Sequence, residues 1–243
     1  MTPAAPPEGE EGLVVDAVLP ALNEEASIGA VLSAIPRPPV RRVVVADNGS
    51  TDRTADVARA HGAVVVAEPR RGYGSACLRG LAALRPDPPH AVLFLDADWS
   101  DDPSEAPRLL EPIAAGRADL VIGSRVLGGA ERGALTAAQR FGNWLATRLL
   151  RLLYGARYTD LGPFRAIRWD ALEALRMRDP DFGWTVEMQG KAARLKLRCE
   201  EVPVRYRRRI GTSKISGTVG GTVRAGVKIL GTIARDRLRG APP

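Results

Sequence analysis

Short apolar runs alternate with amphipathic segments along the first half of the chain. Each run is rich in Val, Ile or Leu, ends in polar residues and is followed by a stretch with helical spacing of its apolar positions. This pattern predicts an α/β fold in which a mostly parallel sheet carries helices on both faces, joined by right-handed crossovers. We expect strands at 13–19, 42–46, 63–67, 119–123 and in a run that ends at Asp96, and helices at 26–35, 54–61, 103–115, 185–195 and in a segment ending at Leu84.

The most informative run is LFLDADWSDDP, which begins at Leu93 and places four acidic residues within seven positions. Asp96 and Asp98 come at the end of the predicted strand and point the same way on extended backbone. They can therefore share one hard divalent cation, Mg²⁺ or Mn²⁺, with positions left open for phosphate oxygens. An acidic loop that caps the helix starting at Pro103 is the alternative, and both descriptions can hold together.

Other polar clusters also fall where predicted strands end. Since parallel strands place their carboxyl ends at one edge of a sheet, we expect these side chains to line one crevice. No G-x-G-x-x-G follows the first strand and there is no Walker A loop, so the sequence predicts neither a dinucleotide site nor a P-loop. Acidic residues with a metal suit a nucleotide diphosphate. The residues expected in the crevice are Asn23, Glu24, Asp47, Asp52, Arg71, Asp96 and Asp98.

Length and composition favour one large domain. The chain has 243 residues, no stretch of 18 consecutive apolar residues, and a Pro-rich acidic start over residues 1–12 that lacks the features of a signal peptide. Its two cysteines form neither a disulfide framework nor a metal cluster, which favours a reducing cytoplasm. We expect a disordered tail at 1–12 and a catalytic domain at 13–214.

The formal net charge of +7 is concentrated at one end. The last 57 residues contain fourteen Lys and Arg against four Asp and Glu, which suggests a partner that presents phosphate: a nucleotide, an anionic membrane or nucleic acid. Residues 215–243 predict a basic amphipathic helix and tail. This helix either docks on its own sheet or a second subunit of a homo-oligomer, or lies on an anionic leaflet as a peripheral anchor.

A second amphipathic segment spans residues 135–154. One stripe holds Phe141, Leu145, Leu149 and Leu152, and another holds Arg140, Trp144, Arg148 and Arg151. A tryptophan among arginines fits an anchor at a membrane interface, and it also fits an ordinary surface helix.

Together these motifs resemble glycosyltransferase family 2, the inverting nucleotide-sugar enzymes with the GT-A fold. The resemblance is closest to the branch that transfers mannose or glucose to polyprenyl or dolichyl phosphate, and it covers about residues 14–214. The motifs that carry it are PALNEE from Pro20, VVADNGSTDRT from Val44, RRGYGSA from Arg70, DADWSDDP from Asp96, VIGSR from Val121, DLGPFRA from Asp160 and RRIGTSK from Arg208.

The resemblance implies a role for each matching residue. It implies a nucleobase and ribose site with Asp47 bonded to the base, a ribose and metal site around Asp96, a metal ligand at Asp98 and a donor-phosphate contact at Arg71. It also implies a group that gathers acceptor phosphate. The base and ribose site comprises Pro20, Leu22, Asn23, Glu24 and Asn48, and the phosphate group comprises Arg125, Arg140, Arg208, Ser213 and Lys214.

Three departures from the family pattern affect these roles. Asn48 stands where the family usually has a second Asp, and an amide both accepts and donates hydrogen bonds. Ser100 takes the place of a Gln after the metal Asp, so we expect a shorter third metal ligand there. DLGPFRA is one residue shorter than usual between Asp160 and its Arg.

We therefore expect a metal-dependent transfer of a hexose from UDP-glucose or GDP-mannose to membrane-borne polyprenyl phosphate. A phosphate acceptor is already an anion and needs no base, whereas a soluble hydroxyl acceptor, the alternative, needs one. Asp160 and Glu187 are the candidates for that base. A basic nucleic-acid-binding module is a more distant alternative, since the tail lacks interleaved aromatic residues and an acidic crevice repels a polyanion. A non-catalytic subunit with the same fold is a further option, against which the intact Asp96 and Asp98 argue.

Overall fold

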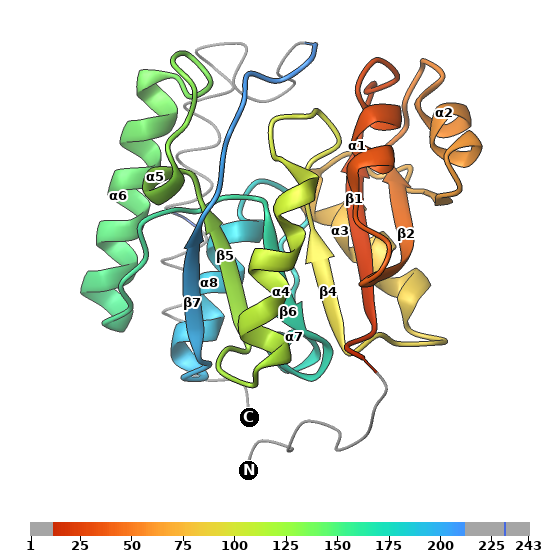
Figure 1. Ribbon diagram of the computed structural model, residues 1–243. Helices are drawn as coiled ribbons and strands as arrows, with labels where there is room; N and C mark the ends of the chain where they lie inside the picture. Colours follow the sequence, from red (N-terminus) through yellow and green to blue (C-terminus); the bar gives the residue numbers. More distant parts are fainter. Residues whose placement is uncertain (1–11, 212–230, 232–243) are drawn as a thin grey trace.

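The computed structural model describes residues 12–211 and residue 231, and its centre is a seven-stranded sheet in the order β3-β2-β1-β4-β6-β5-β7 (Figure 1). All neighbouring strands are parallel except β6, which is antiparallel to both β4 and β5. The strands are β1 Val15–Ala21, β2 Val40–Asp47, β3 Val64–Ala67, β4 Ala91–Phe94, β5 Leu120–Ser124, β6 Arg165–Arg168 and β7 Cys199–Pro203.

Helices cover both faces of this sheet (Figure 1). Helices α1, α2 and α4 bury their apolar residues against one face, and α3, α7 and α8 cover the other. Helix α6 packs outside this layer, against α8. The helices are α1 Ile28–Ala34, α2 Thr54–Ala60, α3 Tyr73–Leu84, the 3-10 turn Pro103–Glu105, α4 Ala106–Ala114, α5 Arg125–Gly128, α6 Ala137–Tyr154, α7 Trp169–Leu175 and α8 Trp184–Arg194.

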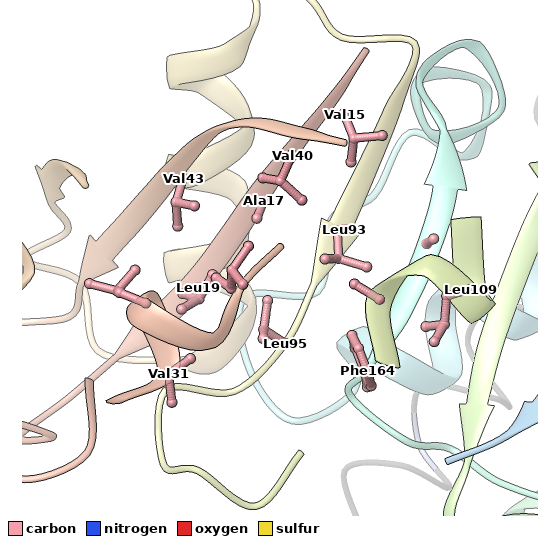
Figure 2. Close-up of a cluster of buried hydrophobic side chains, with 14 of the residues drawn as sticks. Val15, Ala17, Leu19, Val31, Val40, Val43, Leu93, Leu95, Leu109 and Phe164 are labelled. Carbon is pink, nitrogen blue, oxygen red and sulfur yellow. The ribbon is translucent and has the colours of Figure 1, made fainter. Parts of the chain in front are cut away.

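The central strands are apolar throughout because both of their faces are buried. Ala17 and Leu19 of β1 join the cluster under α1 and α4, while Val18 between them joins the cluster on the opposite face. Figure 2 shows the first cluster, in which Leu93 of β4 and Leu109 of α4 lie near the same strands. Alternation of side chains across a strand explains why these segments read as continuous hydrophobic runs in the sequence.

The sheet opens between β1 and β4. Strand β1 pairs with β2 as far as Ala21↔Asp47, but it pairs with β4 only as far as Val18↔Phe94. The expected strand stopped before Pro20, whereas β1 continues through it, which is possible because pairing with β4 has already ended there. From β1 the chain adds β2 and then β3 on one side of the sheet, and β4 is then added on the other side of β1. The position between β1 and β4 is therefore a topological switch point, where α/β sheets bind ligands.

The predicted fold class is confirmed, with three additional elements. The α/β architecture, the mostly parallel sheet and the helices on both faces are present. Strand β6 and helices α5 and α7 were not predicted. Strand β6, with the sequence RAIR, has too little apolar pattern to stand out, although its Arg165 is fully buried.

Two further expectations meet the structure only in part. The predicted tail at 1–12 and helix at 215–243 lie, but for Gly12 and Gly231, outside the described residues. Within the part of the chain that the structure does describe, no helix combines the length and the apolar character needed to cross a bilayer. Cys77 and Cys199 are both free.

The close approach of α3 to β1 can be tested at Gly80. A Cβ atom added there would lie 2.5 Å from Cγ1 of Val18 in the core, so strand or helix must shift. We expect Gly80→Ala to lower the free energy of unfolding by about 1–3 kcal/mol in urea titrations. Gly142 of α6 is the matched control, because a Cβ there meets nothing within 4 Å and the helix propensity of alanine should stabilise it by up to about 1 kcal/mol. Equal shifts in both variants would contradict the tight contact.

Candidate functional site

Acidic residues crowd the loop that follows β4. Asp98 and Asp101 are 3% and 1% exposed, and Asp96 lies beside them at the open end of the sheet. Burial raises the pKa of Asp96, and the negative charge of Asp98 raises it further. Burial also raises the pKa of Asp101, with contributions from Asp96 and Asp98. Carboxylates so placed need cations nearby to remain charged.

Local hydrogen bonds fix the direction of the Asp98 carboxylate. The hydroxyl and the backbone N–H of Ser100 donate to Oδ1 of Asp98 at 2.5 and 2.9 Å. The intervening Trp99 has a φ of 68°, so the chain makes a tight turn that allows both bonds. Ser100 is fully buried and orients Asp98, while the second oxygen of Asp98, Oδ2, contacts the guanidinium of Arg209.

The donor atoms at this loop fit a hard divalent cation. Among the described residues, Oδ1 of Asp96 and both carboxylate oxygens of Asp101 are buried without a hydrogen-bond partner. The described part of the chain contains no preformed group of three or more His, Cys, Asp or Glu side chains that could hold a metal ion. Mg²⁺ and Mn²⁺ do not need one here, because such ions bind through one or two carboxylates together with substrate phosphates. Asp96 and Asp98 would hold the ion.

A pocket opens at the switch point between β1 and β4. Its lining includes Pro20 and Leu22 from the end of β1, the carboxylates of Asp96 and Asp98, and Phe182 from the loop before α8. Several of the residues predicted for the crevice are thus brought together. Its lining comprises Pro20, Ala21, Leu22, Glu24, Asn48, Arg71, Gly72, Tyr73, Ala76, Asp96, Ala97, Asp98, Asp181, Phe182 and Arg209.

Asn48 holds the loop that carries Arg71. Its side-chain amide donates to the carbonyls of Glu68 and Arg70 at 3.0 and 2.7 Å and accepts the N–H of Gly72 at 2.8 Å. A carboxylate could not donate the first two bonds, which gives a structural reason for Asn where the family usually has Asp. The exposed Arg71 is therefore presented at the pocket by a fixed backbone.

Arg125 and Asp160 form a separate buried ion pair next to the acidic loop. The guanidinium donates to both carboxylate oxygens at 2.8 and 2.7 Å and lies 5.0 Å from the ring centroid of Tyr206. Burial alone would lower the pKa of Arg125, but the hydrogen bonds to Asp160 raise it above its ordinary value. Arg125 therefore pairs with Asp160 and not with Asp119, which binds Arg198 instead.

Other predicted residues lie away from the pocket lining. Asn23 accepts the N–H of Thr51 at 2.8 Å, and Asp47 accepts that of Ser50 at 3.1 Å, so both organise the loop after β2. Glu187 of α8 accepts the N–H of Asp179 at 2.7 Å and pairs with Lys191.

Arg125, Arg140 and Arg208, predicted to gather phosphate, are not among the residues that line the pocket. Arg208 donates to the carbonyl of Arg132 at 2.7 Å, and Arg140 is exposed on the first turn of α6. Ser213 and Lys214 lie outside the described residues.

Sequence reasoning missed Arg209, Tyr73 and Phe182. Tyr73 begins α3 and is hydrogen-bonded to Asp96. Phe182 and Arg209 reach the pocket from segments far away in the sequence. Tyr73 lies within the motif RRGYGSA, of which only Arg71 was assigned a role, the DFG stretch around Phe182 gave no signal of its own, and Arg209 was one of several neighbouring arginines.

Fold and site together define an α/β enzyme whose ligand pocket joins an apolar slot to a carboxylate cluster at a sheet switch point. Comparison with known sequences gives the family. The chain belongs to glycosyltransferase family 2, whose sequence profile, "Glycosyl transferase family 2", matches residues 16–176. The predicted class of enzyme, a family 2 glycosyltransferase, is thereby confirmed.

Relatives and solved structures agree with this assignment. An uncharacterized glycosyltransferase of Mycobacterium tuberculosis is 41% identical over 214 residues, covering 87% of this chain and 94% of the relative. The dolichyl-phosphate hexose transferase of Haloferax volcanii is 36% identical and covers 91% and 95%. The structure of glucosyl-3-phosphoglycerate synthase from M. tuberculosis, in complex with Mn²⁺, UDP and glucosyl-3-phosphoglycerate, superposes with a TM-score of 0.74 at 26% identity and covers 96% and 82%.

The role of the Asn48 amide can be tested by replacing it with the corresponding carboxylic acid. In Asn48→Asp the side chain keeps an acceptor for Gly72 but turns a carboxylate toward two carbonyls, so we expect a loss of about 1–3 kcal/mol in the free energy of unfolding. The control is Gln139→Glu, the same chemical change at the start of α6, where a carboxylate can still accept the Thr136 N–H at 2.8 Å. Urea unfolding of both variants measures the difference, and an unchanged Asn48→Asp would refute the donor role.

Proposed function

We propose that this glycosyltransferase moves a hexose from a nucleotide diphosphate sugar to a polyprenyl phosphate at an anionic membrane surface. The observation that carries the proposal is the pocket, whose lining combines the apolar Pro20 and Leu22 with the carboxylates of Asp96 and Asp98 and with Arg71. A nucleotide diphosphate combines matching chemistry, with a flat base and two phosphates.

In this arrangement the base lies against Pro20 and Leu22, and Asp96 lies next to the ribose. Asp98 holds Mg²⁺ or Mn²⁺, and Arg71 donates to the diphosphate with its forked guanidinium. The ion, when bound, neutralises the charge that develops on the leaving diphosphate. The structure of glucosyl-3-phosphoglycerate synthase is a complex with Mn²⁺ and UDP, which supports a divalent ion and a nucleotide diphosphate as the ligands.

The reaction forms one bond and breaks one. An oxygen of the acceptor phosphate attacks C1 of the hexose, the C1–O bond to the diphosphate breaks, and the nucleotide diphosphate leaves with the electron pair and inversion at C1. The acceptor oxygen is already anionic, so no proton has to be removed. The protein's contribution is to align the two anions and screen their charges with arginine and metal.

The surroundings of the candidate bases favour a phosphate acceptor. The Asp160 carboxylate is engaged at both oxygens by Arg125, and Glu187 accepts backbone N–H groups and pairs with Lys191. Neither residue lines the donor pocket. The dolichyl-phosphate hexose transferase among the relatives also supports a lipid phosphate.

A soluble acceptor is the second candidate. Its support is the likeness to glucosyl-3-phosphoglycerate synthase over nearly the whole chain. Incubation with labelled donor and either undecaprenyl phosphate in vesicles or 3-phosphoglycerate in solution separates the two acceptors. The labelled hexose then appears in the lipid phase in the first case, and on a water-soluble product distinct from the donor in the second.

Donor binding gives the first test of the proposed function. We expect calorimetric titration to show binding of UDP-glucose or of GDP-mannose that needs Mn²⁺. We expect Asp98→Ala to lower the transfer rate by roughly 10²–10³-fold, because a charge-stabilising contact is lost. Asp56→Ala, at a surface carboxylate 77% exposed, is the control and should transfer normally. Unchanged transfer by Asp98→Ala would exclude the proposed metal site.

The membrane contact is assigned to one face of α6, the helix at the left of Figure 1. Phe141, Trp144 and Leu152 are 61%, 51% and 79% exposed on it. Arg148, whose guanidinium lies 5.8 Å from the Trp144 ring, shares that face. The face of α6 that packs on the protein contains Ala146 and Leu150. Phe141 and Leu152 of the expected apolar stripe are therefore at the surface. Aromatic rings among arginines match the boundary of an anionic bilayer.

Vesicle binding tests this face. We expect the double variant Trp144→Ser/Leu152→Ser to bind vesicles that contain phosphatidylglycerol at least about tenfold more weakly, since two apolar side chains no longer enter the bilayer. Val64→Ser, at an exposed apolar residue of the edge strand β3, is the control. Binding that is equal in the double variant and the control would remove α6 from the proposal.

A further inference from the structure

A protein cation lies at the carboxylate that the proposed function assigns to the metal. The Nη2 atom of Arg209 contacts Oδ2 of Asp98 and lies 3.7 Å from Oε1 of Glu24. The Asp98 side chain is 4% exposed and that of Arg209 is 30% exposed, so the pair is largely withdrawn from water. Arg209 also lines the donor pocket.

The arginine and a metal ion compete for the same oxygen of Asp98. Oδ1 of Asp98 already accepts two hydrogen bonds from Ser100, which leaves Oδ2 as the available ligand. Arg209 occupies that oxygen. A divalent ion placed there would also face a guanidinium charge at contact distance, and two cations so close repel each other strongly in a partly buried site.

The backbone around Arg209 is anchored, so the exchange needs only a side-chain movement. The N–H of Ile210 donates to the carbonyl of Asp98 at 2.9 Å, and the N–H of Arg207 donates to that of Ser100 at 2.8 Å. Arg207 also pairs with Asp102 and lies 4.9 Å from the Trp99 ring centroid. The segment is thus tied to the acidic loop on both sides of Arg209.

A displaced Arg209 gains a new partner when the donor is present. Its Nε atom is buried without a hydrogen-bond partner among the described residues, and its guanidinium faces the pocket where the diphosphate would lie. Phosphate oxygens are good acceptors for a guanidinium. A metal ion that enters alone takes Asp98 from Arg209 and leaves it the longer contact with Glu24, whereas a diphosphate that enters with the ion supplies Arg209 with new acceptors.

We propose that Arg209 holds the metal position in the donor-free enzyme and passes to the donor diphosphate when the metal binds. This inference rests on the proposed function and deepens it, because it makes metal and donor binding cooperative through one residue. The coupling is reciprocal: the nucleotide raises the affinity for Mn²⁺ by the same factor by which Mn²⁺ raises the affinity for the nucleotide.

Mn²⁺ binding measured by electron paramagnetic resonance, without turnover, tests the proposal. Free Mn²⁺ is titrated into the full chain alone and with saturating UDP or GDP. We expect wild type to bind Mn²⁺ weakly alone and much more tightly with the nucleotide. We expect Arg209→Gln to bind Mn²⁺ alone at least about fivefold more tightly than wild type and to lose most of the effect of the nucleotide. Arg209→Lys, which keeps the charge, should retain part of the coupling.

Arg205→Gln is the matched control. Arg205 lies in the same segment and its removal changes the net charge equally, but it pairs with Asp102 and Glu105 at 3.5 Å and not with Asp98. It should behave as wild type.

The outcomes separate the two levels of the proposal. Equal Mn²⁺ affinities and equal nucleotide effects in wild type and Arg209→Gln would overturn the role of Arg209 and leave the metal-dependent transferase standing. A gain in Mn²⁺ affinity that Arg205→Gln reproduces would also overturn it, because general charge would then be the cause. Wild type that binds no nucleotide with Mn²⁺ would overturn the proposed function, and this inference with it.

Discussion

The carboxylates after β4 repel one another, and arginines from later segments of the chain supply the positive charge that offsets this repulsion. Asp96, Asp98 and Asp101 are brought together after the central strand β4, where Asp98 and Asp101 are almost fully withdrawn from water. Such a cluster is stable only if other elements supply positive charge. Arg209 contacts it from the segment after β7, and Arg125 stands near it at the end of β5 with its own carboxylate partner. The site is therefore strained electrostatically in the absence of ligand, and the divalent ion of the proposed function would relieve that strain.

The sheet supplies the space for the ligand by the early end of one pairing. Because β4 stops pairing with β1 after Val18, the last residues of β1 have no neighbouring strand along one edge. Pro20 and Leu22 then line the pocket. Proline suits this place, since it has no N–H that would need a partner. Asn48 then fixes the loop on the other side. The pocket thus depends on where β1 and β4 stop pairing and on the side-chain amide of Asn48.

Sequence patterns predicted the parts of the site that sit directly at strand ends. Asp96, Asp98 and Arg71 could be placed because parallel strands bring their carboxyl ends together. The antiparallel β6 could not, because RAIR is short and charged and is buried only by its neighbours. Nor could the exposed face of α6, since periodicity gives two stripes without saying which one meets the core.

The three consecutive arginines after β7 explain why Arg209 was not foreseen and what sets its role. On nearly extended backbone, neighbouring side chains point to opposite sides. Arg207 turns to Asp102 and Trp99, Arg208 to the carbonyl of Arg132, and Arg209 to Asp98. The sequence RRR is the same in any register, so the choice is made by the backbone bonds that align this segment with the acidic loop. A slip of one residue would place a different arginine at the metal position, and the basic charge of this segment is therefore specific in its placement, because each guanidinium has its own acceptor.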